Sequence, residues 1–181
     1  MRVDIKPNTY LYLVILLFLL PIEWLLAWLM AMVVHEFSHW LGVKLCGGKV
    51  LELSASIGGI QMQSTPLTDR KRLFSILSGP FGGLLLASLG RWFPRMALCS
   101  WVLSVYNLLP LLFLDGGKAL EIIAGASVAT VTEKIILVLL SFLAIYVSVL
   151  LGFGILPVAV IVGLWLKSRK SPCKQSICKL Q

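Results

Sequence analysis

The two histidines of the chain lie four residues apart, in an H-E-x-x-H pattern at residues 35–39. In a helix, residues i and i+4 share one face, so both imidazoles can bind the same Zn²⁺ ion. Glu36 can then serve as general base toward a metal-activated water. The alternative is a pair of packing histidines, but three ionisable groups in an apolar helix are costly and usually mark function. The pattern predicts one zinc ion per chain, bound by His35 and His39.

A catalytic zinc needs a third protein ligand and an open position for water. Asp115 is the best candidate, because it ends a later apolar run and is followed by Gly116 and Gly117, which allow close backbone approach. Its alternative role is to cap a helix over 118–124. We expect Glu23 at the opposite end of the histidine helix. The other acidic residues, Glu133 among them, are expected in exposed loops or termini.

The elements that carry these residues are those of a membrane protein. Of the 181 residues, 59% are hydrophobic and 13% are charged, with a mean hydropathy of +0.94. Soluble domains have about 25% charged residues, so a soluble globule is excluded. The apolar residues form blocks long enough for helices that cross a bilayer. The fold class is therefore an all-α polytopic membrane protein.

Six membrane spans are predicted from these blocks. The run over 135–166 exceeds one span, so we divide it near Gly152 to Gly154. No cleavage site follows the first run, which we expect to be retained. The predicted spans are 10–21, 24–44, 73–90, 96–114, 135–151 and 155–166.

Positive charge supports this topology. With six spans, every Lys and Arg except Arg91 and Arg95 lies on one side, which is expected to be cytoplasmic. Both termini, His35, His39 and Asp115 belong to that side. The net charge of +8 is then a property of the loops, and no nucleic-acid partner is expected.

Residues 47–65 do not form another span. Alternating polar and apolar residues between Gly47-Gly48 and Gly58-Gly59 predict a small β-hairpin between the second and third helices. Residues 1–166 form one domain, and 167–181 form a basic, disordered cytoplasmic tail. The four cysteines have no C-x-x-C spacing and are expected to be reduced.

The motifs carry a family resemblance. The H-E-x-x-H pattern at 35–39, followed by an N-x-x-P-x-x-x-x-D-G pattern at 107–116, resembles the paired motifs of the site-2 protease family of intramembrane zinc metalloproteases. Ser78-Gly79-Pro80 resembles a Gly-Pro motif of that family, and Gly58-Gly59 its glycine-bearing strand region. Ser38 stands where the family usually has glycine, a small-for-small change. The likeness extends from about residue 31 to residue 117.

This resemblance implies roles for individual residues. His35, His39 and Asp115 would bind zinc, and Glu36 would activate water to hydrolyse a peptide bond within or near the membrane. Asn107 would hold the substrate or stabilise the oxyanion, or else form an interhelical hydrogen bond. Pro110 would open the fourth helix so that Asp115 faces the metal. Gly116, Gly79 and Pro80 would support the site. For Gly79, Pro80, Gly58 and Gly59, close packing without a chemical role is the alternative.

The architecture resembles the stage IV sporulation protein FB type, whose members release a sigma factor from a membrane-associated precursor. That branch often carries a CBS domain, whereas 15 residues follow Leu166 here. The resemblance implies a bacterial cytoplasmic membrane, a membrane-associated protein substrate and regulatory membrane partners. Two other functions remain open. The chain could be a non-proteolytic, metal-binding partner or scaffold, although such a protein needs no base at Glu36; it could also be a transporter.

The predicted site can be tested without a substrate. Detergent-purified protein is expected to contain about one zinc per chain, with zinc lost or weakened in His39→Ala and Asp115→Ala. Metal analysis of the three proteins is the measurement. A folded wild type without zinc would end the zinc hypothesis, and loss in His39→Ala alone would show that Asp115 is the wrong third ligand.

Overall fold

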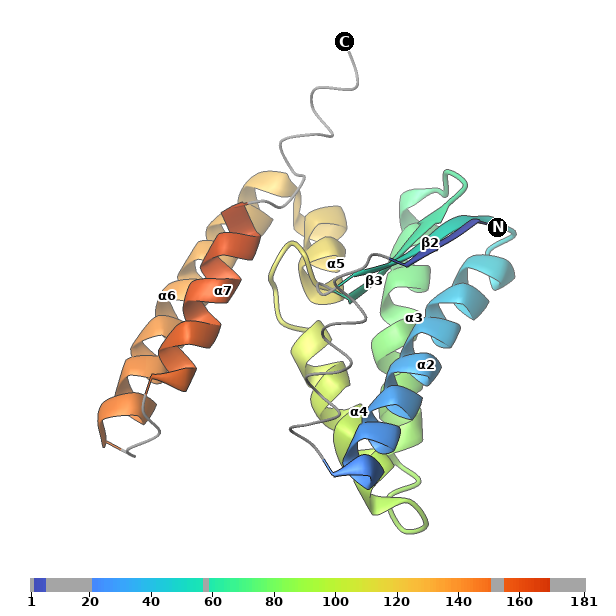
Figure 1. The fold of residues 1–181 in the computed structure, drawn as a ribbon. Coiled ribbons are helices and arrows are strands. Elements are labelled where there is room, and N and C mark those ends of the chain that lie inside the picture. Colours follow the sequence, from blue (N-terminus) through green and yellow to red (C-terminus); the bar gives the residue numbers. More distant parts are fainter. Residues whose placement is uncertain (1, 6–20, 57–58, 151–154, 170–181) are drawn as a thin grey trace. The chain divides into compact units, whose positions relative to one another are not determined.

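A computed structural model describes residues 2–5, 21–56, 59–150 and 155–169. The chain divides into two compact units, Met1–Asn107 and Leu108–Gln181, which are described separately. Figure 1 labels the elements. The first unit contains β1 (Arg2–Ile5), α2 (Ile22–Leu45), β2 (Val50–Ser56), β3 (Gly59–Ser64), α3 (Asp69–Ala87) and α4 (Pro94–Asn107). The second contains α5 (Asp115–Ala124), α6 (Ala126–Leu150) and α7 (Leu156–Arg169).

In the first unit, helices α2, α3 and α4 pack against one another through small residues. Ser100 Oγ donates a hydrogen bond to the Gly83 carbonyl at 2.8 Å, and Ser104 Oγ donates to the Ser100 carbonyl at 2.8 Å. Small interface residues let helix backbones approach closely, as in membrane helix bundles. The buried small residues are Ala27, Ala31 and Gly42 of α2, Ser75, Gly79 and Gly83 of α3, and Ala97, Ser100 and Ser104 of α4.

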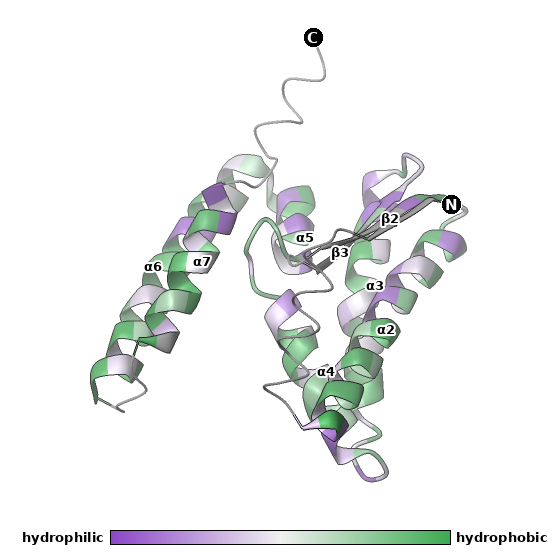
Figure 2. Cartoon of the chain, in the orientation of Figure 1, coloured by the Kyte–Doolittle hydropathy of each residue, from purple (hydrophilic) through white to green (hydrophobic). Residues whose placement is uncertain are grey.

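Large apolar side chains of the same helices point outward. Phe37 is 56% exposed, Phe81 70% and Trp101 52%. In a soluble domain these side chains would form the core, because their burial is the main source of stability. Figure 2 shows hydrophobic residues along most of the three helices, whereas hydrophilic residues gather on the sheet and the adjoining ends of α2 and α3. This distribution suits an apolar solvent around the helices.

The sheet has three strands in the order β1-β2-β3. Strands β2 and β3 form the predicted antiparallel hairpin between α2 and α3, with an irregular register between Val50 and Glu52. Strand β1 pairs parallel with β2, so that Arg2 lies opposite Glu52. We did not predict a strand at the N-terminus.

In the second unit, a non-helical connection over 108–114 leads into α5. Leu111 and Leu114 of this connection are buried against Leu137 of α6, and Leu164 and Trp165 of α7 pack on the same cluster. Trp165 Nε1 also donates to Ser141 Oγ at 3.2 Å, which joins α7 to α6. The connection is therefore anchored mainly by apolar contacts with α6 and α7.

The predicted fold class is confirmed in part: the described chain is mostly helical, with a β-hairpin between α2 and α3. Among the described residues, one helix, α6, is long and apolar enough to cross a membrane, with a hydropathy of 2.2. Six spans are therefore not confirmed. The span predicted over 10–21 and the break near Gly152 lie outside the described residues.

The helix predicted over 96–114 ends instead at Asn107, and the next begins at Asp115. The reason is Pro110: it has no N–H to donate, and it disfavours helical backbone at the residue before it. The helix that contains the predicted span 135–151 is α6, and it begins earlier than expected, at Ala126.

Close packing of α3 on α4 predicts a selective effect at Gly83. A Cβ at this position would collide with Ser104 Oγ, whereas nothing lies within 4 Å of a Cβ at Gly163 of α7. Gly83→Val should lower the free energy of unfolding by about 1–3 kcal/mol through overpacking. Gly163→Val should be neutral or slightly stabilising, because glycine is a poor helix former. Thermal unfolding in detergent measures both, and equal effects would contradict the packing described here.

Candidate metal centre

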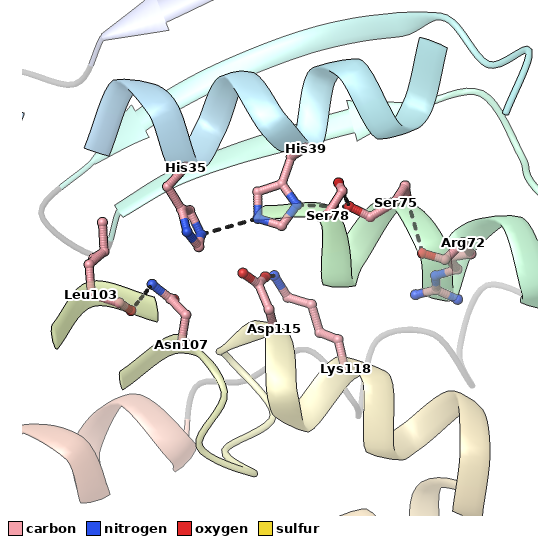
Figure 3. Close-up of polar contacts among 9 residues, drawn as sticks. All are labelled: His35, His39, Arg72, Ser75, Ser78, Leu103, Asn107, Asp115 and Lys118. Atoms are coloured by element: carbon pink, nitrogen blue, oxygen red, sulfur yellow. Dashed lines mark hydrogen bonds and ion pairs between the residues drawn. The ribbon is translucent and has the colours of Figure 1, made fainter. Parts of the chain in front are cut away.

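Helix α2 places the two histidines side by side. The Nε2 atoms of His35 and His39 are 3.2 Å apart, and the rings meet edge to face with centroids 4.8 Å apart. His35 is 3% exposed, so its ring lies inside the first unit. Figure 3 shows both imidazoles on the same face of the helix. The i, i+4 spacing thus brings together the two residues that the sequence predicted.

The orientation of His39 is set by α3. Its Nδ1 lies 2.8 Å from the carbonyl oxygen of Ser75. A carbonyl oxygen accepts hydrogen bonds and cannot donate, so Nδ1 must carry the proton. In the neutral ring, Nε2 then has a lone pair, which is directed toward His35 Nε2. Histidine ligands of metals are commonly oriented in this way by a backbone carbonyl.

This geometry fits a zinc ion. Two nitrogen ligands at about 2.0–2.1 Å in a tetrahedral site lie about 3.3–3.4 Å from each other. The observed separation of 3.2 Å is close to that value. Two imidazoles at this distance, one of them oriented by Ser75, are therefore arranged as two ligands of one metal.

Glycine at position 79 makes room for the His39 ring. A Cβ on Gly79 would collide with three atoms of the imidazole. Two other glycines allow similarly close contacts between α2 and α3. A Cβ on Gly82 would collide with Ser38, and a Cβ on Gly42 would collide with Ser78. Gly79 therefore packs closely, as its alternative role predicted, and the group that it packs against is a candidate metal ligand, His39.

Further hydrogen bonds join α2 to α3. Ser78 Oγ contacts the carbonyl oxygens of Ser38 at 2.8 Å and Ser75 at 2.7 Å. Pro80 lies inside α3 and is fully buried. It therefore belongs to the same tightly packed stretch of helix that carries Ser75.

Glu36 and Asn107 also belong to the first unit. Glu36 follows His35 on α2 and is half-buried. Asn107 is the last residue of α4, and its Nδ2 donates to the Leu103 carbonyl at 3.0 Å, within its own helix. In Figure 3 the Asn107 side chain points toward His35. Their positions are compatible with the predicted roles, which stay predictions.

Asp115 belongs to the second unit, where it is the first residue of α5. It is 7% exposed, and Lys118 Nζ lies 3.4 Å from its Oδ1. The capping position is occupied by Leu114, without a side-chain hydrogen bond, so the alternative of Asp115 as helix cap is wrong. A carboxylate in the first turn is still favoured by the helix dipole.

Two glycines beside Asp115 allow the chain to fold back on itself. A Cβ on Gly116 would collide with the Leu108 carbonyl, and one on Gly117 with the Leu111 carbonyl. Pro110 lies in the same non-helical connection. The local backbone that presents Asp115 therefore depends on small residues that the sequence had associated with this site.

One acidic residue was placed wrongly. Glu133 was expected in an exposed loop, but it lies on α6 with 3% of its surface exposed. Its Oε1 accepts a hydrogen bond from the backbone N–H of Leu112 at 3.2 Å. The partner of Glu133 is a backbone N–H group, so no residue pattern in the sequence indicated this contact.

Comparisons with known proteins support the fold. No protein-family model matches the chain, and no curated protein matches it. Among solved structures, it is similar to the site-2 protease from Methanocaldococcus jannaschii, with a TM-score of 0.65 and 18% sequence identity. The similarity covers 93% of this chain and 89% of that one. The two proteins thus share a fold, while the resemblance to the sporulation type stays a prediction.

The contact between Gly79 and His39 predicts a selective loss of metal binding. Gly79→Ala should displace the imidazole and weaken zinc affinity by about 10- to 100-fold, as changes around metal ligands commonly do. Gly82→Ala is the matched control, because it disturbs the same helix pair at Ser38 and leaves His39 in place. Zinc affinity by competition with a chelator is the measurement. Equal affinities in the two variants would contradict this role of Gly79.

Proposed function

We propose that the chain is a membrane-embedded zinc metalloendopeptidase, which cleaves a membrane-associated protein within or near the bilayer. The observation that carries this proposal is the histidine pair, with Nε2 atoms 3.2 Å apart and His39 oriented by Ser75. The likeness of fold to a site-2 protease adds support. So does Glu36, since a protein that merely binds metal needs ligands but no base.

His35, His39 and Asp115 together supply two imidazoles and one carboxylate, a donor set that could hold a metal ion. This set matches a catalytic zinc site, which has three protein ligands and an open position. We propose Asp115 as the third ligand, on the evidence of its place in the D-G motif and its burial at the start of α5. Zinc bound there would polarise the peptide carbonyl and acidify a water molecule.

The residues of the chain would then handle the protons. The Glu36 carboxylate takes a proton from the attacking water as the new C–O bond forms, and delivers it to the peptide nitrogen as the C–N bond breaks. The Asn107 amide donates a hydrogen bond to the carbonyl oxygen, where negative charge develops. To do so, the Asn107 amide would either break its hydrogen bond to the Leu103 carbonyl or donate the second N–H of its NH₂ group.

The membrane setting is part of the proposal. Exposed large side chains on α2, α3 and α4, together with the apolar length of α6, support helices surrounded by lipid. We propose six spans with both termini cytoplasmic, a catalytic domain over residues 1–166 and a basic tail over 167–181. A membrane-tethered regulator, such as a sigma-factor precursor in a bacterial membrane, is the substrate class suggested by the motif resemblance.

Replacement of the proposed base separates catalysis from metal binding. Glu36→Gln should reduce cleavage by about 10²- to 10⁴-fold, the usual contribution of a general base, while zinc content stays at the wild-type level. The assay uses single-span reporter proteins co-reconstituted in liposomes with the full chain, and products are identified by mass spectrometry.

Ser38→Gly provides the control within the same motif. Ser38 Oγ hydrogen-bonds the Val34 carbonyl of its own helix at 2.7 Å and approaches Gly82, so its removal should leave cleavage within about threefold of wild type. Cleavage that persists undiminished in Glu36→Gln would refute the assigned base. A zinc-loaded wild type that cleaves none of the reporters would favour the metal-binding scaffold instead.

A further inference from the structure

A buried carboxyl group on α6 has no part in the chemistry proposed above. Glu133 is 3% exposed and lies within a helix long and apolar enough to cross a membrane. An ionisable side chain in such a helix is costly and usually has a specific partner. The partner here is a backbone group: the N–H of Leu112 donates to Glu133 Oε1 at 3.2 Å.

Leu112 lies in the non-helical connection over 108–114, where the backbone cannot form helical hydrogen bonds. In an apolar environment every such N–H needs an acceptor. Leu111 N donates to the Leu109 carbonyl at 2.8 Å, and Leu114 N donates to the Leu111 carbonyl at 2.7 Å. Those two bonds are internal to the connection. The bond from Leu112 instead ties this backbone to α6.

Side chains strengthen the same attachment. Leu111 and Leu114 are buried on Leu137, one turn of α6 beyond Glu133. Helix α7 contributes as well, because Lys167 Nζ lies 4.5 Å from the centroid of the Phe113 ring. Glu133 therefore supplies the polar contact within the otherwise apolar surface of α6 that packs against residues 108–114.

We propose that Glu133 is a positioning residue for the metal centre. By accepting the Leu112 N–H, it fixes the backbone three residues before Asp115, at the entry to α5. This inference rests on the proposed function, in which Asp115 is the third zinc ligand. The essential property is an oxygen acceptor at the correct reach, so the negative charge of Glu133 is not required.

Two conservative variants separate the effect of the length of the Glu133 side chain from the effect of its negative charge. Glu133→Gln keeps the length of the side chain and an acceptor oxygen but removes the charge. Glu133→Asp keeps the charge but shortens the side chain by one methylene. The proposal predicts zinc affinity within about threefold of wild type for Gln and a loss of about 10- to 100-fold for Asp, the range typical of residues that support metal ligands. Chelator competition on the full chain in detergent gives the affinities.

Two further measurements report on the site and on the connection. The visible spectrum of the Co²⁺-substituted protein should change in Glu133→Asp and stay like wild type in Glu133→Gln, because it depends on ligand geometry. Amide hydrogen exchange of the peptide covering 108–114 should be at least tenfold faster in the Asp variant. The exchange measurement needs no metal, so it tests the anchor even in a protein without zinc.

Ser141→Ala is the matched control. It removes the hydrogen bond from Trp165 between α6 and α7 but leaves Glu133 and Leu112 untouched. Zinc affinity and exchange of 108–114 should stay at wild-type levels in this variant. A comparable loss in Ser141→Ala would show that general loosening of α6 and α7 is sufficient, and would overturn a specific role for Glu133.

The outcomes distinguish this inference from the proposed function. Wild-type zinc binding that depends on His39 and Asp115, with unchanged affinity in Glu133→Asp, would overturn the positioning role alone. A greater loss in Gln than in Asp would also overturn it, because charge would then matter more than reach. If the wild type binds no zinc, the proposed function fails, and faster exchange in the Asp variant would still establish the anchor.

Discussion

The hydrogen bond between His39 Nδ1 and the Ser75 carbonyl sets the geometry of the histidine pair in the candidate metal centre. It spans two helices, and an imidazole can reach a backbone oxygen of the neighbouring helix only where that helix carries no bulky side chain. Gly79, one turn after Ser75, meets this requirement, since a Cβ there would occupy the space of the ring. The orientation of His39 and the packing of α2 on α3 thus depend on the same small residues of α3.

Features that depend on local spacing could be predicted from the sequence. The i, i+4 histidines share a face of α2 because helical geometry requires it, and their Nε2 atoms meet at 3.2 Å. The hairpin between α2 and α3 followed from alternating residues bounded by glycine. Asp115 was singled out for its neighbours Gly116 and Gly117, which do pack against backbone carbonyls. Its function as a ligand is still a prediction.

Features that depend on contacts distant in the chain could not be predicted. The run over 96–114 stays apolar on both sides of Asn107, so hydropathy did not reveal where the helix ends. Glu133 was misplaced because its partner is a backbone N–H, which leaves no trace in residue type. Strand β1 pairs with β2 across fifty positions of sequence, and its four residues are too few for alternation to predict a strand. For Glu133 and β1 the determining interaction is non-local, whereas the end of α4 reflects Pro110, a local signal that hydropathy does not contain.

The separation of small buried residues from large exposed ones affects how such a chain can evolve. Exchanges among leucine, valine and phenylalanine on the outward faces of α2, α3 and α4 alter no internal contact, so most positions can drift freely as long as they stay apolar. Selection then acts on a sparse set of glycines, serines and polar groups at the helix contacts. Two chains could therefore differ at most positions and still share a fold, as a TM-score of 0.65 at 18% identity illustrates.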